Sequence, residues 1–127
     1  MFNAYYKVYN TLGYGFLEKV YENALAIALR KMKLNVEQQK NIKVYYESEA
    51  VGDYYADLLV EDLVIVELKT AKELCEEHEA QLINYLKATT IEVGLLFNVG
   101  KEPKFKRKIF ENHLKDNRNT DATDFNG

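Results

Sequence analysis

The sequence predicts an α/β domain of the α+β type, in which helices flank a central mixed β-sheet. Apolar residues recur at helical spacing up to about residue 34 and then alternate as in strands up to residue 68. A further helical segment precedes a nearly continuous apolar run, which is typical of a strand buried on both faces. A chain of 127 residues with 47% hydrophobic residues and one proline is enough for one core, so we expect one domain.

The first part of the chain predicts two helices. Residues 3–12 carry apolar side chains at helical spacing, and Gly13 and Gly15 end this short helix. A second helix is expected from about Phe16 to about Leu34. Its apolar face is expected to consist of Leu17, Val20, Tyr21, Ala24, Ala28 and Met32. The charged residues expected elsewhere around this helix are Lys19, Glu22, Arg30 and Lys33.

Residues 41–68 predict three antiparallel strands in a meander, with a turn at 48–52 and a second connection near 61–62. The length of that second connection decides the register. A two-residue turn would place Ala56 opposite Glu67 and send Asp57 to the other face of the sheet. A three-residue loop through Leu63, or a bulge, would instead place Asp57 opposite Glu67. The sequence does not choose between the two registers.

The remaining elements are a helix over 73–88 and a buried strand over 91–99 that is central or parallel in the sheet. The stretch 105–110 is either an edge strand or a short basic helix. Residues 115–127 are polar and rich in Asn and Asp, so they predict a disordered tail after a domain of residues 1–114.

Composition excludes several classes of protein. The chain has 17 Lys+Arg against 20 Asp+Glu, so it lacks the broad basic surface of a dedicated nucleic-acid binder, and any such contact must be local. The single cysteine, Cys75, excludes an intramolecular disulfide and a cysteine-based zinc site, and it fits a reducing compartment. We find neither an apolar window of about 20 residues nor a signal peptide, and therefore expect a cytoplasmic protein without a membrane segment.

The strongest chemical signal is Asp57 followed by Glu67-Leu68-Lys69. Glu67 and Lys69 share one face of a strand because side chains at i and i+2 point the same way. With Asp57 opposite Glu67, two carboxylates would bind a divalent cation such as Mg²⁺ through oxygen. Lys69 would then orient or deprotonate the attacking water, or offset charge on a phosphate.

The competing interpretation of these charges is a cross-strand ion pair on a solvated face, worth about 0.2–1 kcal/mol. However, the flanking segments 58–60 and 63–68 are so apolar that this hairpin is expected at the centre of the sheet. Charges in such a place are unfavourable unless they are paired or hold a metal ion, which favours the metal site.

Three further side chains lie on one stripe of the helix predicted over 73–88, because His78, Gln81 and Tyr85 are spaced at i, i+3 and i+7. The stripe faces either the metal site or the core. Tyr85 alone favours the core, whereas Gln81 among apolar neighbours needs a hydrogen-bond partner and favours a site. Glu18, near a helix start, is explained without a site by the helix dipole, at about 0.3–1 kcal/mol.

Four segments in this order resemble the GxxExxY protein family. They are GFLEKVY at 15–21, YADLLV at 55–60, VIVELK at 64–69 and HEAQLINYL at 78–86. The glycine loop at 12–15 also looks like the loop of that family, and the resemblance covers roughly residues 8–110. The family is assigned to the PD-(D/E)XK nuclease-like superfamily, which implies a restriction-endonuclease-like αβββαβ core.

The resemblance also implies a role for each matching residue. Asp57 and Glu67 would be the metal-binding carboxylates, Lys69 the catalytic lysine and Glu18 the acidic residue of the first core helix. Gln81 and Tyr85 resemble the QxxxY helix motif of RecB-like nucleases, which implies that they orient catalytic groups or contact the substrate. The implied activity is a nuclease dependent on Mg²⁺ or Mn²⁺, acting on DNA in preference to RNA.

A local basic cluster provides candidate substrate contacts. It consists of Lys101, Lys104, Lys106, Arg107 and Lys108. A solvated strand edge explains the same cluster equally well.

The alternative function is a binding or assembly module that keeps the nuclease fold without turnover. Its small size, its pI near 5.5 and its ten tyrosines motivate this alternative, since tyrosine is enriched at interfaces. The tyrosines expected to pack against a second copy in a homodimer are Tyr5, Tyr6, Tyr9 and Tyr14.

Overall fold

The computed structural model describes residues 1–115 of the chain. The helices are α1 (Phe2–Leu12), α2 (Glu18–Lys31), α3 (Glu76–Lys87) and the 3₁₀ helix η1 (Asn112–Leu114). The strands are β1 (Val36–Tyr46), β2 (Glu49–Val60), β3 (Val64–Lys69), β4 (Val93–Val99) and β5 (Pro103–Ile109). Of the segment predicted to be a tail, only Lys115 belongs to the described residues, and its ammonium donates to the carbonyls of Thr89 and Ile91.

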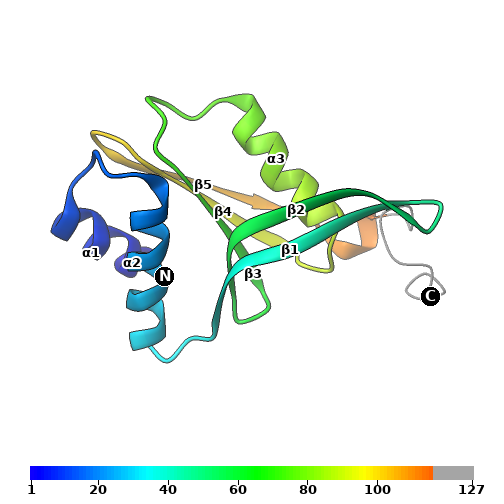
Figure 1. The fold of residues 1–127 in the computed structure, drawn as a ribbon, viewed down its shortest axis with the longest axis horizontal. Helices are drawn as coiled ribbons and strands as arrows, with labels where there is room; N and C mark the ends of the chain where they lie inside the picture. The colour runs from blue at the N-terminus through cyan, green and yellow to red at the C-terminus, as the bar shows by residue number, and fades with distance from the viewer. Residues whose placement is uncertain (116–127) are drawn as a thin grey trace.

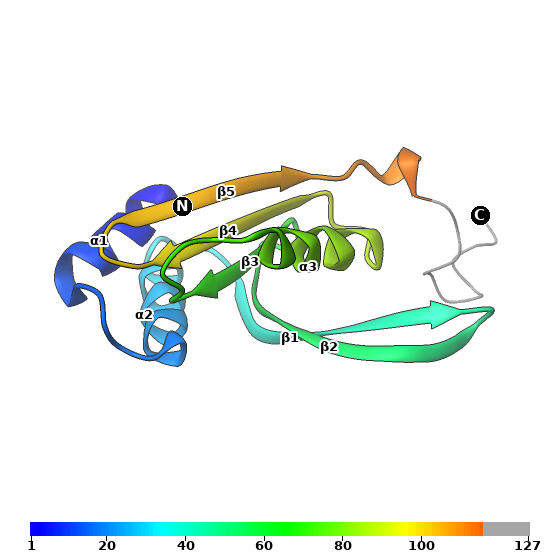
Figure 2. The same cartoon turned by 90° about the horizontal axis from the view of Figure 1, so that it is seen from above.

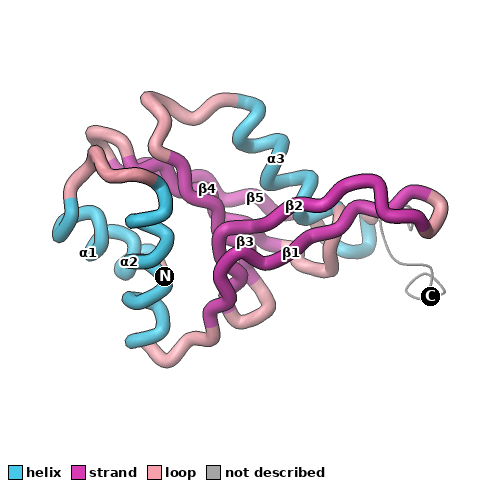
Figure 3. Tube along the Cα trace, in the orientation of Figure 1, coloured by secondary structure: helices cyan, strands magenta, loops and turns pink. Residues whose placement is uncertain are grey.

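The five strands form one mixed sheet in the order β1-β2-β3-β4-β5 (Figures 1 and 3). The pairs β1–β2 and β2–β3 are antiparallel, which confirms the predicted meander. Strand β4 runs parallel to β3 after the crossover through α3, as expected for an apolar strand in the middle of a sheet. The stretch around 105–110 forms the edge strand β5, antiparallel to β4, and not a helix.

Helices cover both faces of this sheet. On one face, which we call the α1/α2 face, the strand residues Leu58, Val66, Leu68 and Phe97 pack against α1 and α2. The other face, the α3 face, buries the alternate strand residues, including Leu59, Ile65 and Leu96, against α3. In Figure 2, α3 lies between the β1–β2 hairpin and the strands β4 and β5, so the twisted sheet curves around this helix. The predicted fold class is therefore confirmed.

The buried face of α2 differs from the prediction. Leu17, Val20 and Met32, expected on the apolar face, are 79%, 37% and 49% exposed. The buried residues of the helix are Tyr21, Glu22, Leu25, Ala26 and Leu29. The buried face of α2 is therefore rotated relative to the expected apolar face. It includes Glu22, a charged residue that the hydrophobic pattern placed among the solvent-facing positions.

The β1–β2 hairpin is longer than predicted and projects beyond the rest of the sheet (Figure 1). Its turn is the dipeptide Glu47-Ser48, with positive φ angles of 49° and 68°, and not the stretch 48–52. Gly52 lies inside β2, where an added Cβ would come within 2.9 Å of the Tyr54 ring, so this glycine permits close packing and does not make the turn. None of the helices within residues 1–115 has the length and apolar character that a membrane crossing requires.

Candidate active site

The connection between β2 and β3 selects the register. Val60 pairs with Val64 and Leu58 with Val66, so three residues, 61–63, form the loop. Glu61 and Asp62 both take a left-handed conformation, with φ near 55°, and the Leu63 amide donates to the carbonyl of Val60 at 2.9 Å. The same register, continued by one step, places Asp57 opposite Glu67. Of the two registers that the sequence allows, the structure has the one that joins these carboxylates.

Asp57 and Glu67 are fixed by each other's strands. The Asp57 amide donates to Oε2 of Glu67 at 2.7 Å, and the Leu68 amide donates to Oδ2 of Asp57 at 2.8 Å. At the end of the β2–β3 ladder, each carboxylate thus accepts a hydrogen bond from a backbone amide of the other strand, as a backbone carbonyl does within the ladder. The second oxygen of Asp57, Oδ1, accepts only a long hydrogen bond of 3.4 Å from the Gln39 amide, and Oε1 of Glu67 has no hydrogen-bond partner among the described residues.

The two carboxylates lie in an environment that disfavours their charge. Glu67 is only 4% exposed, and burial raises its pKa to about 8, with a further contribution from the charge of Asp57. Burial also raises the pKa of Asp57, and the nearby carboxylates of Glu22 and Glu18 add to this effect. A bound divalent cation would offset this concentrated negative charge.

Lys69 and Gln81 meet beside this pair. Lys69 shares the α3 face with Glu67, and its Nζ donates to Oε1 of Gln81 on α3 at 3.2 Å. Tyr85, one turn further along α3, is buried, and burial together with the charges of Glu67 and Asp57 raises its pKa to about 12. Gln81 thus lies beside Lys69, whereas Tyr85 belongs to the buried apolar cluster of the α3 face, with its ring centroid 5.9 Å from that of Tyr54, as its core interpretation predicts.

His78, the third member of that stripe, has a different role. Its Nδ1 accepts a hydrogen bond from the backbone amide of Cys75 at 3.2 Å and lies 3.4 Å from the Cys75 sulfur. Cys75 is the N-cap of α3, so the two side chains form a capping box at the helix start. His78 thus stabilises the helix end and is not grouped with the carboxylates.

Glu18 is exposed as the first residue of α2, and its charge contributes to the raised pKa values of both Asp57 and Glu67. One turn later, Glu22 is 3% exposed and accepts hydrogen bonds from the amides of Gln38 and Gln39, each at 2.7 Å. The Gln39 amide also reaches Oδ1 of Asp57 at 3.4 Å. This network connects α2 with the carboxylate pair.

Sequence reasoning missed Glu22 and Gln39. A signal for Glu22 was its i, i+4 spacing from Glu18, which places both acids on one side of α2. Gln39 had no comparable signal, because its position depends on a local distortion of β1. Its φ is 53°. The neighbouring residues Gln38 and Lys40 pair with Leu58 and Ala56 of β2, whereas Gln39 itself has no partner in that ladder.

The loop before α2 is held by Tyr21. The hydroxyl of this buried side chain donates to the carbonyl of Gly13 at 2.6 Å and accepts from the Phe16 amide at 3.1 Å. Gly13 and Gly15 have φ angles of 70° and 112°, which side-chain-bearing residues rarely adopt. The spacing of glycine, glutamate and tyrosine at 15, 18 and 21 thus has a structural reason, since Tyr21 fixes the loop that leads into Glu18.

The predicted basic cluster is divided between the two faces of β5. Lys106 and Lys108 form ion pairs with Glu79 of α3, so the even-numbered lysines, Lys104 included, lie on the α3 face. The alternate residues point to the other face, where the Phe105 ring lies 4.7 Å from that of Phe2 on α1. Arg107 shares that opposite face, because residues two apart in a strand point the same way. Arg107 therefore does not lie on the same face of β5 as Lys104 and Lys106.

Two of the N-terminal tyrosines are used inside the chain. Tyr5 is 1% exposed, donates to the Asn98 carbonyl at 2.9 Å, and stacks on Phe97 with ring centroids 4.0 Å apart. The Tyr9 hydroxyl donates to the carbonyl of Lys101. The buried Tyr5 is thus unavailable to a dimer partner, which contradicts the expectation for that residue, whereas Tyr14 is 55% exposed.

The donor set fits a hard divalent cation. Within residues 1–115, no group of three or more His, Cys, Asp or Glu side chains is arranged to hold a metal ion. The candidate ligands remain Asp57 and Glu67. Such a set suits Mg²⁺, which typically takes one or two carboxylates and completes its shell with water and substrate phosphate.

A central mixed sheet with helices on both faces, bearing an Asp-Glu-Lys group at its middle strands, defines the class to which this protein belongs. A family model described as the PD-(D/E)XK nuclease superfamily matches residues 1–109, and the chain belongs to that superfamily. The five-stranded sheet is consistent with the restriction-endonuclease-like fold. Searches of curated proteins and of solved structures each gave no match.

Proposed function

We propose that this protein is a divalent-metal-dependent nuclease of the GxxExxY type, which hydrolyses phosphodiester bonds of DNA in preference to RNA. One observation carries the proposal: Asp57 and Glu67 are cross-bonded at adjacent strands, and Lys69 extends from the same face. Within the described residues, neither carboxylate forms an ion pair with Lys69. A purely structural ion pair is therefore a poor explanation for these buried charges.

In this proposal Asp57 and Glu67 would hold Mg²⁺ or Mn²⁺. When bound, the cation supplies a water of lowered pKa and offsets charge on the phosphate. Gln81 orients the Lys69 ammonium, which stabilises the negative charge that develops as the bond to phosphorus breaks. Glu18 adds an exposed carboxylate whose charge acts on both Asp57 and Glu67, and Tyr85 borders the site as a proposed substrate contact.

Lys104 and Lys106 are retained as proposed substrate contacts, because both lie on the α3 face. We also propose a cytoplasmic location, supported by the exposed free thiol of Cys75, which suits a reducing compartment. A homodimer through the N-terminal tyrosines does not belong to the proposal.

The test is a cleavage assay on single-stranded, double-stranded and branched DNA and on RNA, with Mg²⁺, Mn²⁺ or EDTA. We expect cleavage of DNA only with a divalent cation. Lys69→Ala should reduce the rate by roughly 10²–10³-fold and leave the Mn²⁺-dependent rise in melting temperature intact, since only transition-state stabilisation is lost. Asp57→Ala should abolish both cleavage and the metal-dependent rise, because it removes a ligand.

Lys31→Ala is the matched control, since Lys31 is an exposed lysine at the end of α2 and should behave as the wild type. A wild type that neither responds to metal nor cleaves any substrate would favour the non-catalytic binding module. Cleavage by Lys69→Ala at the wild-type rate would contradict the assigned role of this lysine.

A further inference from the structure

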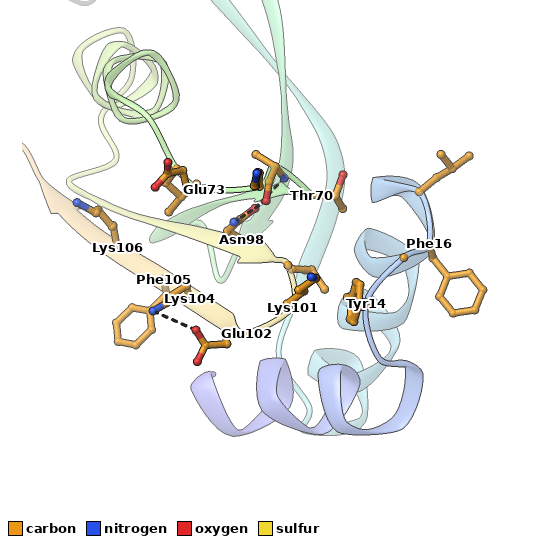
Figure 4. Close-up of a pocket in the computed structure, with 17 residues that line it drawn as sticks. Tyr14, Phe16, Thr70, Glu73, Asn98, Lys101, Glu102, Lys104, Phe105 and Lys106 are labelled. Atoms are coloured by element: carbon orange, nitrogen blue, oxygen red, sulfur yellow. Dashed lines mark hydrogen bonds and ion pairs between the residues drawn. The ribbon is translucent and has the colours of Figure 1, made fainter.

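A second concave region adjoins the carboxylate site. It is a cavity of about 770 Å³ between the loop before α2, the segment after β3 and the β4–β5 hairpin (Figure 4). This volume is within the range of about 300–1,000 Å³ that is typical of ligand pockets. The nuclease proposal assigns no role to most of the residues that line this cavity. We call it the loop pocket.

The loop pocket borders the proposed active site on two sides. Its lining includes Leu17, directly before Glu18, and Thr70, directly after Lys69. The segment at 70–71 is fixed, because the buried side chain of Asn98 both donates to the Ala71 carbonyl and accepts from the Ala71 amide, each at 2.9 Å. A molecule in the pocket would therefore lie next to the group that is proposed to cleave phosphodiester bonds.

The walls combine positive charge with an exposed aromatic ring. Four lysines line the cavity, against two glutamates, in a chain whose net charge is negative. The lysines are Lys72, Lys101, Lys104 and Lys106. Among the described residues, Lys72 and Lys101 form no ion pair, and the ion pair of Lys104 with Glu102 is long, at 3.8 Å, and highly exposed. Lys72 and Lys101 can therefore bind phosphate without breaking an ion pair, and Lys104 would give up only an exposed one.

Tyr14 supplies the aromatic ring. It lies at the centre of the loop that Tyr21 fixes, and 55% of its surface is exposed. Figure 4 shows Tyr14 on the α2 side of the pocket, facing the β4–β5 side where Lys101 lies, while the Phe16 ring points away. An aromatic face beside phosphate-binding lysines is the arrangement by which proteins bind unpaired nucleotides, since every base can stack on a ring.

A duplex does not fit this arrangement. Its bases are stacked on one another, so their faces cannot reach a ring inside a concave site unless they are unpaired or flipped out. We propose that the loop pocket binds unpaired nucleotides of the substrate strand, with a base on Tyr14 and phosphates on Lys72, Lys101 and Lys104. This inference rests on the proposed nuclease function, and it makes single-stranded DNA, or DNA with a single-stranded end, the substrate class.

The sharpest test uses the absence of tryptophan from the chain. The variant Tyr14→Trp introduces a single indole into the pocket, and its fluorescence should be quenched when oligothymidine binds in EDTA, where no cleavage occurs. The matched control is Tyr46→Trp, at an exposed position of the β1–β2 hairpin away from the pocket, which should show no quenching. Quenching of both variants, or of neither, would overturn the proposal.

Affinity gives a second readout. In EDTA, fluorescence anisotropy should show that the wild type binds oligothymidine more tightly than a blunt DNA hairpin. Tyr14→Ala should weaken single-strand binding by about tenfold, and Tyr14→Phe should keep it, since the ring and not the hydroxyl stacks. Lys101→Gln should reduce the slope of log affinity against log salt by about 0.7, whereas Lys31→Gln should not. Equal or tighter binding of the blunt hairpin, or of an equal-length RNA, would overturn the assignment of single-stranded DNA.

The two proposals can fail separately. If the wild type cleaves DNA with metal but Tyr14→Ala leaves single-strand binding unchanged, the pocket assignment fails and the nuclease proposal stands. If oligothymidine quenches Tyr14→Trp but no metal supports cleavage of any substrate, the pocket assignment stands and the nuclease proposal fails.

Discussion

The two faces of the sheet are built from the same strands but carry different chemistry. The α1/α2 face is lined by apolar side chains over four strands, and two helices cover it. The α3 face is covered by one helix of 12 residues, and its apolar cluster continues into Glu67, Lys69 and Asp57. The alternation of side chains in a strand makes this possible, since every second residue can be polar without disturbing the opposite face.

This contrast indicates which face provides stability and which provides function. The core cluster of the α1/α2 face takes only apolar side chains from its strands, whereas Glu67 and Asp57, beside the core of the α3 face, are carboxylates whose pKa values are raised by burial. We therefore expect substitutions on the α1/α2 face to change stability, and substitutions among the polar groups of the α3 face to change metal binding and activity.

The largest effect is expected on the α1/α2 face. Phe97 is fully buried and stacks on Tyr5, so Phe97→Ala should reduce the free energy of unfolding by about 3–5 kcal/mol. Urea denaturation measures this change. Phe16→Ala removes the same ring from a position that is 49% exposed and should lower stability by less than about 1 kcal/mol. Similar losses for the two variants would contradict the role of the α1/α2 face as the main source of stability.

The pH dependence of stability should come from the α3 face. The pKa of Glu67 is about 8 in the folded protein and 4.5 as a reference, so the folded state keeps its proton over a range where the unfolded state loses it. The metal-free protein should therefore lose stability as pH rises from about 5 to about 8, by at most about 1.4 kcal/mol per pH unit from this group.

Glu67→Gln should flatten this slope, because the amide resembles the protonated acid, and it should raise stability at pH 8 in EDTA. Glu37→Gln, at an exposed position of β1, is the matched control and should keep the wild-type slope. Melting curves between pH 5 and pH 8 provide the measurement. A wild type whose stability increases over this range would show that Glu67 is charged in the folded protein without metal.

Packing of α3 on the sheet should be sensitive at one glycine. A Cβ on Gly94 of β4 would lie 2.6 Å from Cδ1 and 2.8 Å from Cγ of the buried Leu82 on α3. Gly94→Ala should reduce stability by about 1–3 kcal/mol through overpacking. Leu82→Ala relieves the contact, so the double variant should be more stable than the sum of the single effects predicts. Additive effects would contradict a direct clash.

Several elements followed from local sequence. The strand meander was predictable from alternation, and β4 from its apolar run, because these features depend on neighbours within a few residues. For β5 the sequence left an edge strand and a short basic helix open. Glu67 and Lys69 were assigned to one face for the same reason. Arg107 was not separated from Lys104 and Lys106, because the basic cluster was taken as one group, although alternation divides it between two faces.

The missed features depend on contacts that are distant in sequence. Glu22 is buried because Gln38 and Gln39, on β1, donate to its carboxylate, and helical periodicity carries no information about such partners. The position of Asp57 depends on the backbone of Glu61 and Asp62, two residues without the usual preference of Asn-Gly for left-handed angles. The turn at 61–62 therefore decides on which face of the sheet Asp57, a candidate metal ligand, lies.

The smallest expected effect concerns this turn. Asp62 has a φ of 55°, which side-chain-bearing residues adopt at a free-energy penalty, so Asp62→Gly should stabilise the protein by about 0.5–1 kcal/mol. Glu61 should remain, because its carboxylate accepts a hydrogen bond from the Asn35 amide. The same change in the middle of β2, Asp53→Gly, should destabilise, since glycine weakens a strand and the bond from Asn41 is lost.

Thermal denaturation of the two glycine variants measures the difference, and metal-dependent cleavage by Asp62→Gly should match the wild type because the register of Asp57 is kept. If Asp62→Gly instead lowers the melting temperature, the left-handed turn is not what fixes the register. If it keeps stability but loses metal-dependent stabilisation, the strand has slipped and Asp57 has moved to the α1/α2 face, since a shift of one residue reverses every side chain in a strand. The turn would then be the element that separates the two faces.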